Sequence, residues 1–293
     1  MVFDRLFTVS RDRAIKFLAL VFTVLGPFGA RAQPIYLDVN DQSPRSLGAA
    51  GSYISFSDDQ SAFSQNPAGL SRHSENRKIF LSNHFVDGWK NWALQGAVID
   101  GKTEDPLHWG FSFNSVHTDL ERKDRYSLGL SFNWKNLFLV GLTNDLFNFG
   151  NASLTTDEWS YGMNFGALAF IGDYIAIGGA VIHAVKMRND ANPLPRSYNG
   201  GLSLNVLKFR LDAEIHRDQD RKKFIYRSGL EYQPMDSTTF RAGYHQDQSG
   251  DEKIYSFGVT LNPVGNRFSL DLGYLDQLKS SFKALSVGMS LRL

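Results

Sequence analysis

The most regular feature of the chain is an alternation, with a period of two residues, between apolar and small or polar positions. The last such stretch places five apolar side chains on one face: Leu285, Val287, Met289, Leu291 and Leu293. Because successive side chains of a strand point to opposite faces, this pattern predicts a strand with one apolar face. A tilted strand of about ten residues crosses a lipid bilayer. The pattern therefore favours a strand of a transmembrane barrel.

The same alternation recurs along the chain and predicts about fourteen strands. They lie near 78–86, 91–99, 107–116, 125–134, 136–144, 157–171, 173–186, 197–206, 208–216, 224–233, 237–246, 253–262, 267–276 and 283–293. Many of these stretches run for about nine or ten residues, whereas strands of soluble sandwiches have about five or six. We therefore expect an all-β fold, a transmembrane antiparallel β-barrel of about fourteen strands.

The connections between these strands alternate between short and longer segments. The short ones include 135–136, 172–173 and 207–208, and the longer, charged ones are 118–124, 144–156, 187–196 and 217–223. Short periplasmic turns and longer external loops are typical of outer-membrane barrels. The segment 100–106 departs from this rhythm, because it is long on the side predicted to be short.

The chain before the first strand divides into two segments. Basic residues precede an apolar stretch at 17–25, and Ala30-Arg-Ala32 has the form of a cleavage site, which predicts a signal peptide over 1–32. The segment 33–77 is too irregular to form barrel wall. A barrel of fourteen strands encloses more space than its wall side chains fill, so we expect 33–77 to plug a barrel formed by 78–293.

Composition excludes several classes of function. A net charge of +1 does not provide the concentrated positive field of a nucleic-acid-binding protein, and the chain has no cysteine for thiolate metal sites. The 7 histidines are scattered without the spacing of metal ligands, and no nucleophile with a base and an orienting group is apparent. We expect no enzymatic activity, no cofactor and no metal.

Several charged residues fall on the polar face of the predicted strands and are expected to face the lumen. They are Arg210, Asp212, Glu214, Arg227, Glu231, Arg241, Asp271 and Arg292. A solvated, salt-bridged lumen wall is the simpler interpretation of this set, and a polar selectivity ladder is the alternative.

The segment from Arg45 to Leu70 carries a motif. It combines Gly48-Ala-Ala-Gly51, an acidic pair, and Asn66-Pro-Ala-Gly-Leu70 ahead of the first strand. This arrangement resembles the amino-terminal signature of the FadL-like superfamily of outer-membrane barrels. That superfamily includes transporters of fatty acids and other hydrophobic compounds, and the shorter PorV/PorQ-type barrels associated with type IX secretion.

The resemblance implies a fourteen-stranded barrel whose amino-terminal segment lies in the bore. It assigns a structural role in the plug turn to Asp58, Asp59, Asn66, Pro67, Ala68 and Gly69. In this reading the acidic pair caps a short helix, and Asn66-Pro67 ends it, because proline disfavours a helical conformation at the preceding residue.

The short, charged loops and the ionic lumen favour the PorV/PorQ-type branch. The sequence thus predicts a partner-binding barrel for secretion or envelope machinery in the outer membrane of a Gram-negative bacterium. Two alternatives remain open, a transporter of small hydrophobic compounds and a narrow pore for polar solutes. The expected partners are outer-membrane lipid and the barrel-assembly machinery, joined by secretion or surface proteins in the first case and by hydrophobic small molecules in the second. No nucleic acid is expected.

Overall fold

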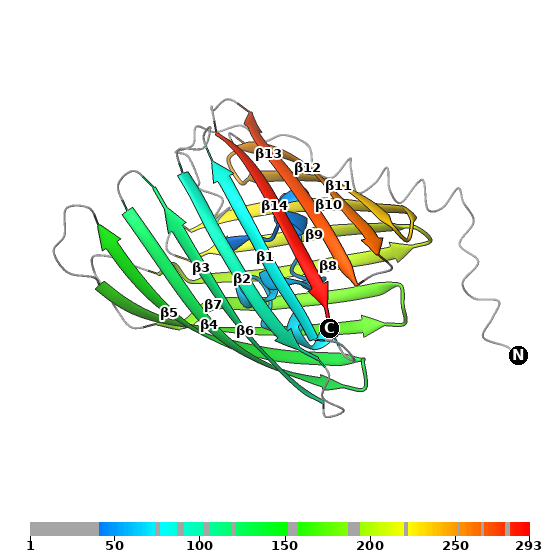
Figure 1. Cartoon of the computed structure of the whole chain (residues 1–293), viewed down its shortest axis with the longest axis horizontal. Coiled ribbons are helices and arrows are strands. Elements are labelled where there is room, and N and C mark those ends of the chain that lie inside the picture. Colours follow the sequence, from blue (N-terminus) through cyan, green and yellow to red (C-terminus); the bar gives the residue numbers. More distant parts are fainter. Residues whose placement is uncertain are drawn as a thin grey trace, which may run out of the picture.

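The protein is a closed antiparallel barrel with a short helical segment inside it (Figure 1). The computed structural model describes residues 41–73, 77–86, 91–101, 106–118, 121–151, 158–186, 194–219, 222–250, 252–264, 267–278 and 282–293. The expected signal peptide lies outside the described residues. Each strand pairs with its neighbours in sequence, and the first pairs with the last, which closes the wall.

The wall consists of fourteen strands. They are β1 (Arg77–Val86), β2 (Asn91–Asp100), β3 (Leu107–His117), β4 (Glu121–Trp134), β5 (Phe138–Asn151), β6 (Glu158–Ile171), β7 (Ile175–Lys186), β8 (Ser197–Val206), β9 (Phe209–Asp218), β10 (Lys223–Met235), β11 (Thr238–Asp247), β12 (Lys253–Val264), β13 (Phe268–Leu278) and β14 (Lys283–Arg292). The predicted fold and strand number are confirmed.

Two of the expected long connections are shorter in the structure. β4 already begins at Glu121 and β5 continues to Asn151, and the two strands pair along this extension. The alternation is weak there because Arg122 and Lys123 give both faces of the strand a polar residue. A strand that extends beyond the lipid does not need an apolar outer face, so the hydrophobic pattern underestimates its length.

The apolar face of the strands points outward. On β4, the side chain of Leu128 is 51% exposed, whereas the neighbouring Ser127 is 1% exposed. Closure leaves no strand edge unpaired, which a wall in lipid requires because water cannot satisfy the backbone there. A closed barrel with an apolar outer band is the architecture of a Gram-negative outer-membrane protein. The turns 135–137, 172–174 and 207–208 then mark the periplasmic end.

In the described residues 41–73, three short helices lie inside the barrel, blue in Figure 1. They are α2 (Pro44–Gly48), η3 (Gln60–Phe63) and η4 (Pro67–His73). Residues 41–73 are called the plug below. Ser43 caps α2 by accepting a hydrogen bond from the Ser46 amide, and Asp59 caps η3 through the Ser61 amide. No helix in the described part of the chain is long and apolar enough to cross a membrane.

A charge on the outer face should destabilise the barrel in proportion to its depth in the bilayer. Leu128→Arg places a cation near the middle of β4, and we expect it to lower the free energy of unfolding by about 2–4 kcal/mol. The matched control Leu137→Arg lies in a periplasmic turn, where the cost should be about 0–1 kcal/mol. Equilibrium unfolding in liposomes measures both, and equal losses would contradict the outward orientation of Leu128.

Candidate functional site: the plugged bore

The plug lies directly against the barrel wall, because the inward face of the wall is lined with glycine. The inward glycines that approach plug atoms come from β3 to β7 and from β10 to β14: Gly110, Gly129, Gly141, Gly166, Gly178, Gly229, Gly243, Gly258, Gly273 and Gly288. A Cβ at Gly141 would lie 2.3 Å from the Pro67 carbonyl carbon, and one at Gly273 would lie 2.4 Å from the Pro44 carbonyl oxygen. Positions 141 and 273 therefore admit glycine alone without moving the plug.

The fully buried side chain of Asn66 joins the plug to itself and to the wall. Its amide group donates to the carbonyl oxygens of Ile54, at 2.8 Å, and Ala167 on β6, at 3.1 Å. Its own oxygen accepts from the Ala68 amide at 3.2 Å. Close by, a Cβ at Gly69 would lie 1.7 Å from the Ser57 carbonyl oxygen. Of the residues that the sequence assigned to a plug turn, 66–69 thus lie where two plug segments meet β5 and β6, whereas Asp58 and Asp59 bond to the α2 segment through Arg45 and Ser43.

The plug has an apolar side, which faces β1 and β2. Ala62, Phe63 and Leu70 form one buried cluster with three inward wall residues, Phe80, Ala97 and Ile99. Each large side chain buried in this way contributes on the order of 1.5–3 kcal/mol. The carbonyl oxygen of Phe63 also accepts hydrogen bonds from Thr143 and Asn164 on the neighbouring wall. Apolar packing of the Phe63 side chain and hydrogen bonds to its carbonyl oxygen therefore both fix this residue against the wall.

The opposite side of the plug faces an ionic wall. Glu231 on β10 accepts from Arg241, at 2.6 Å, and pairs with Arg210, at 3.3 Å. Arg210 also pairs with Asp212 at 3.0 Å. Of the charged residues that the sequence placed in the lumen, five are buried on the inward face and three are partly buried there: Arg210, Asp212, Glu214, Arg241 and Asp271, then Arg227, Glu231 and Arg292. Arg210, Asp212, Glu231 and Arg241 compensate one another in one network. Such pairs are costly to break singly, because the remaining charge stays buried.

Two further lumen residues bond the backbone of the plug. The carboxylate of Glu214 accepts from the Ile54 amide. The guanidinium of Arg227 donates to the Gly51 carbonyl oxygen at 3.1 Å. Irregular backbone needs such partners when it is buried, because each unsatisfied group costs a hydrogen bond. The ionic residues of β9 and β10 thus serve in part as hydrogen-bond partners for plug backbone that lies outside the three short helices.

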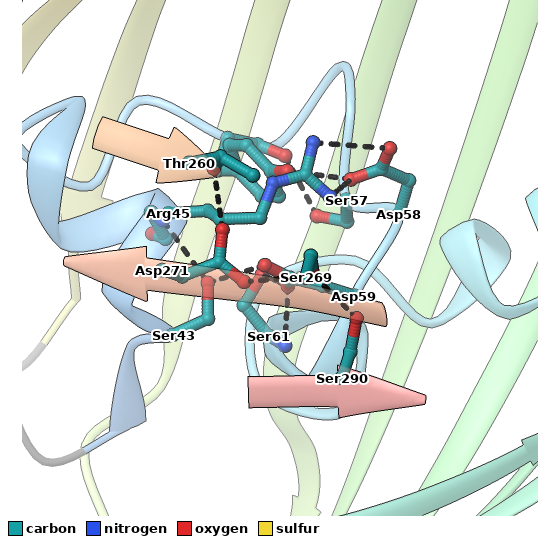
Figure 2. A network of polar contacts seen from close by, with 12 residues as sticks. Ser43, Arg45, Ser57, Asp58, Asp59, Ser61, Thr260, Ser269, Asp271 and Ser290 are labelled. Carbon is teal, nitrogen blue, oxygen red and sulfur yellow. Dashed lines mark hydrogen bonds and ion pairs between the residues drawn. The ribbon is translucent and has the colours of Figure 1, made fainter. Parts of the chain in front are cut away.

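Figure 2 shows the acidic pair of the plug close to β12, β13 and β14. Asp58 pairs with Arg45 at 3.0 Å, and Asp59 accepts from Ser43 and from Ser61. On the wall, Thr260 donates to Asp271. The acidic pair is therefore split, because one carboxylate forms an ion pair and the other caps η3.

Burial raises the pKa of the Asp59 carboxyl group, and nearby Arg45 acts in the opposite direction. A raised pKa means that the folded plug binds this proton more readily than the unfolded chain. Its stability therefore falls as the pH rises from the ordinary carboxyl pKa through the raised one.

Two hollows lie along the barrel wall, one of them beside the plug. A groove of about 510 Å³ opens on the lipid-facing side of β1, β2, β3, β13 and β14, around Gly96. A second hollow of about 290 Å³ lies at the periplasmic mouth, beside Arg72 of the plug. Sequence reasoning missed both, because each combines residues from strands far apart in the chain. Among the described residues, no group of histidine and acidic side chains could hold a metal ion.

No protein-family model matches the sequence, and no curated protein sequence matches it either. The toluene transporter TodX of Pseudomonas putida has a similar structure, with a TM-score of 0.69, 12% identity, and coverage of 90% of this chain and 98% of that one. The toluene transporter TbuX of Ralstonia pickettii aligns with a TM-score of 0.64, 13% identity, and 87% and 98% coverage.

A FadL homologue of Pseudomonas aeruginosa is also similar, with a TM-score of 0.63, 13% identity, and coverage of 86% of this chain and 97% of that one. The chain has the fold of the FadL-like barrels. At these identities the likeness shows the fold alone. It agrees with the broader family resemblance of the sequence and gives no support to the PorV/PorQ-type branch.

Forcing the plug away from its glycine contacts should open the bore. Gly141→Val introduces a Cβ at 2.3 Å from Pro67, so the plug must move while the strand can still form. Gly179→Val is the control, because a Cβ there meets nothing closer than 3.8 Å. In planar bilayers we expect steady conductance from Gly141→Val, and only background current from the wild type and the control. A silent Gly141→Val barrel, shown to be folded by its heat-dependent gel mobility, would argue against the seal.

Proposed function

We propose that the protein carries small hydrophobic compounds across the outer membrane. The solved structures with similar folds include two toluene transporters and a monoaromatic hydrocarbon channel. One observation in this chain supports the proposal most strongly. The lipid-facing groove and the apolar cluster of the plug meet at the same two wall residues, Phe80 and Ala97.

The groove has the size and chemistry of a site for a small apolar molecule. Its floor lies at Gly96, which faces outward and carries no side chain, and a Cβ there would lie 3.2 Å from the ring of Phe113. Its walls are apolar side chains of neighbouring strands: Ile79, Leu81, Val98, Phe111, Met289 and Leu291. A volume of about 510 Å³ lies within the range of about 300–1,000 Å³ of small-molecule sites.

Apolar surface continues on the inner side of the same wall. Phe63 and Leu70 of the plug pack on Phe80 and Ala97, so apolar groups line both faces of the sheet at this place. A hydrophobic compound is attracted to such surfaces because they remove it from water. We infer that compounds which reach the apolar side of the plug leave toward the membrane near β1 and β2.

The ionic residues of the bore do not oppose this route. The charges of Arg210, Glu231 and Arg241 are already paired with one another when an apolar compound passes elsewhere in the bore. The same pairing argues against a pore for polar solutes, because these charged side chains bind one another in the wall. The partner-binding function favoured by the sequence finds no support in the similar folds.

Filling the groove should slow transport. Gly96→Leu occupies the floor of the groove, and we expect the uptake of radiolabelled toluene to fall on the order of tenfold, as for a hydrophobic site that loses its space. Gly200→Leu is the matched control, because a Cβ there meets nothing closer than 4.0 Å. Uptake is measured in cells that lack their own hydrocarbon channels. Unchanged uptake by a correctly assembled Gly96→Leu barrel would contradict the proposal.

A further inference from the structure

Arg72 differs from the other arginines of the plug and the ionic wall. It lies on η4, the last plug helix, beside the hollow at the periplasmic mouth. Arg45 pairs with Asp58, and Arg210 pairs with acidic wall residues. Within the described residues, by contrast, Arg72 has no hydrogen bond or ion pair, and its Nη1 atom is buried without a partner. An arginine held in this way keeps an unused donor.

Aromatic rings hold the guanidinium group of Arg72 in place. Its central carbon lies 3.9 Å from the ring centroid of Phe56 and 5.1 Å from that of Phe170. The guanidinium of Arg210 lies 3.3 Å from the same Phe56 ring, so this ring is contacted by two cations. Contacts with ring faces orient the guanidinium plane, but they leave its N–H groups free to donate. Arg72 is therefore positioned in advance for an acceptor.

The hollow beside Arg72 has a polar part and an apolar part. Ser71, Asn133, Asn136 and Asn205 contribute polar groups, and Leu139, Phe170 and Ile175 contribute apolar surface. The side-chain oxygen of Asn136 accepts from Asn133, and the backbone amide of Asn136 donates to Asn133 in return. The side-chain amide hydrogens of Asn136 have no acceptor among the described residues. The hollow thus offers two kinds of donor next to apolar side chains.

The charge balance at this place favours a bound anion. Burial lowers the pKa of Arg72, because the cation has left water without gaining an ion pair, and Arg210 lowers it further. Asp58 acts in the opposite direction, but it is already paired with Arg45. Asp173 also lines the hollow and is exposed to solvent, where its charge is screened.

We propose that Arg72 and Asn136 form a binding site for a small organic carboxylate that enters from the periplasm. A planar carboxylate matches the fork of a guanidinium group, and the apolar residues suit a compact aromatic or aliphatic body. Asn136, Gly172 and Asp173 belong to periplasmic turns, so the hollow lies at that end of the barrel. The site also lies apart from the groove at Gly96, so it does not depend on the transport route proposed above.

Calorimetry on the detergent-solubilised barrel tests the site, with sodium benzoate as the probe. We expect Arg72→Gln to weaken benzoate binding by about tenfold or more, because a charge-assisted hydrogen bond is lost. Asn136→Asp should have a similar effect by repulsion and does not alter any plug contact. Arg217→Gln and Asn262→Asp are the matched controls, since they make the same chemical changes away from the hollow, and both should bind as the wild type does.

Two further ligands distinguish the contribution of the carboxylate charge from that of the apolar body. Benzyl alcohol has the same apolar body without the charge, and inorganic phosphate has the charge without the body. Strong binding of benzoate alone supports the proposal. Equal binding of benzyl alcohol, binding of phosphate in preference to benzoate, or unchanged benzoate binding by Asn136→Asp would each overturn it. Arg72→Gln could also shift η4 in the bore. Asn136→Asp still tests the site in that case, because Asn136 lies in a wall turn.

Discussion

The close contact between the plug and the glycine-lined wall is the constraint on which the rest of this structure depends. A barrel of fourteen strands encloses more space than its wall side chains fill. The wall extends some large side chains into that space, among them Phe80 and Arg210, and leaves the rest of it to the plug. It carries glycines on strand after strand, and the backbone of the plug fills the room that they leave. Any side chain at Gly141 or Gly273 would displace Pro67 or Pro44.

The plug divides the bore into two chemically different halves. On one side, Phe63 and Leu70 pack against β1 and β2 in an apolar cluster. On the other, the backbone near Ile54 is bonded to charged residues of β9 and β10. The plug also joins the two kinds of contact, because Arg210 of the ionic wall lies over the ring of Phe56. The proposed passage of hydrophobic compounds belongs to the first half and the proposed carboxylate site to the periplasmic end.

The sequence predicts the wall well because lipid imposes a simple rule on it. An outward residue such as Leu128 must be apolar, so the alternation marks nearly every strand. The rule stops applying beyond the lipid, which is why the outer end of β5 was not predicted. The inward glycines carry a second signal, since a small residue at the middle of so many strands indicates a closely packed segment inside.

The contacts of the plug could not be predicted in the same way. The sequence identifies Glu214 and Arg227 as lumen residues, but their partners are backbone groups of Ile54 and Gly51, more than a hundred positions away in the chain. The groove around Gly96 and the unpaired Nη1 of Arg72 also arise only when distant strands come together. The alternation along a strand predicts which face of the wall a residue occupies. Its contacts in the bore depend on segments that come together only in the closed barrel.

The most direct measurement is the accessibility of a single thiol in the plug, since the chain has no cysteine of its own. Ala62→Cys replaces a residue that is 0% exposed between the plug and the wall, and Leu207→Cys replaces one that is 97% exposed in a periplasmic turn. In liposomes that expose both sides to a polar maleimide, the account predicts rapid labelling at 207 and labelling at 62 only after unfolding. Equally rapid labelling of both positions in the folded barrel would contradict it.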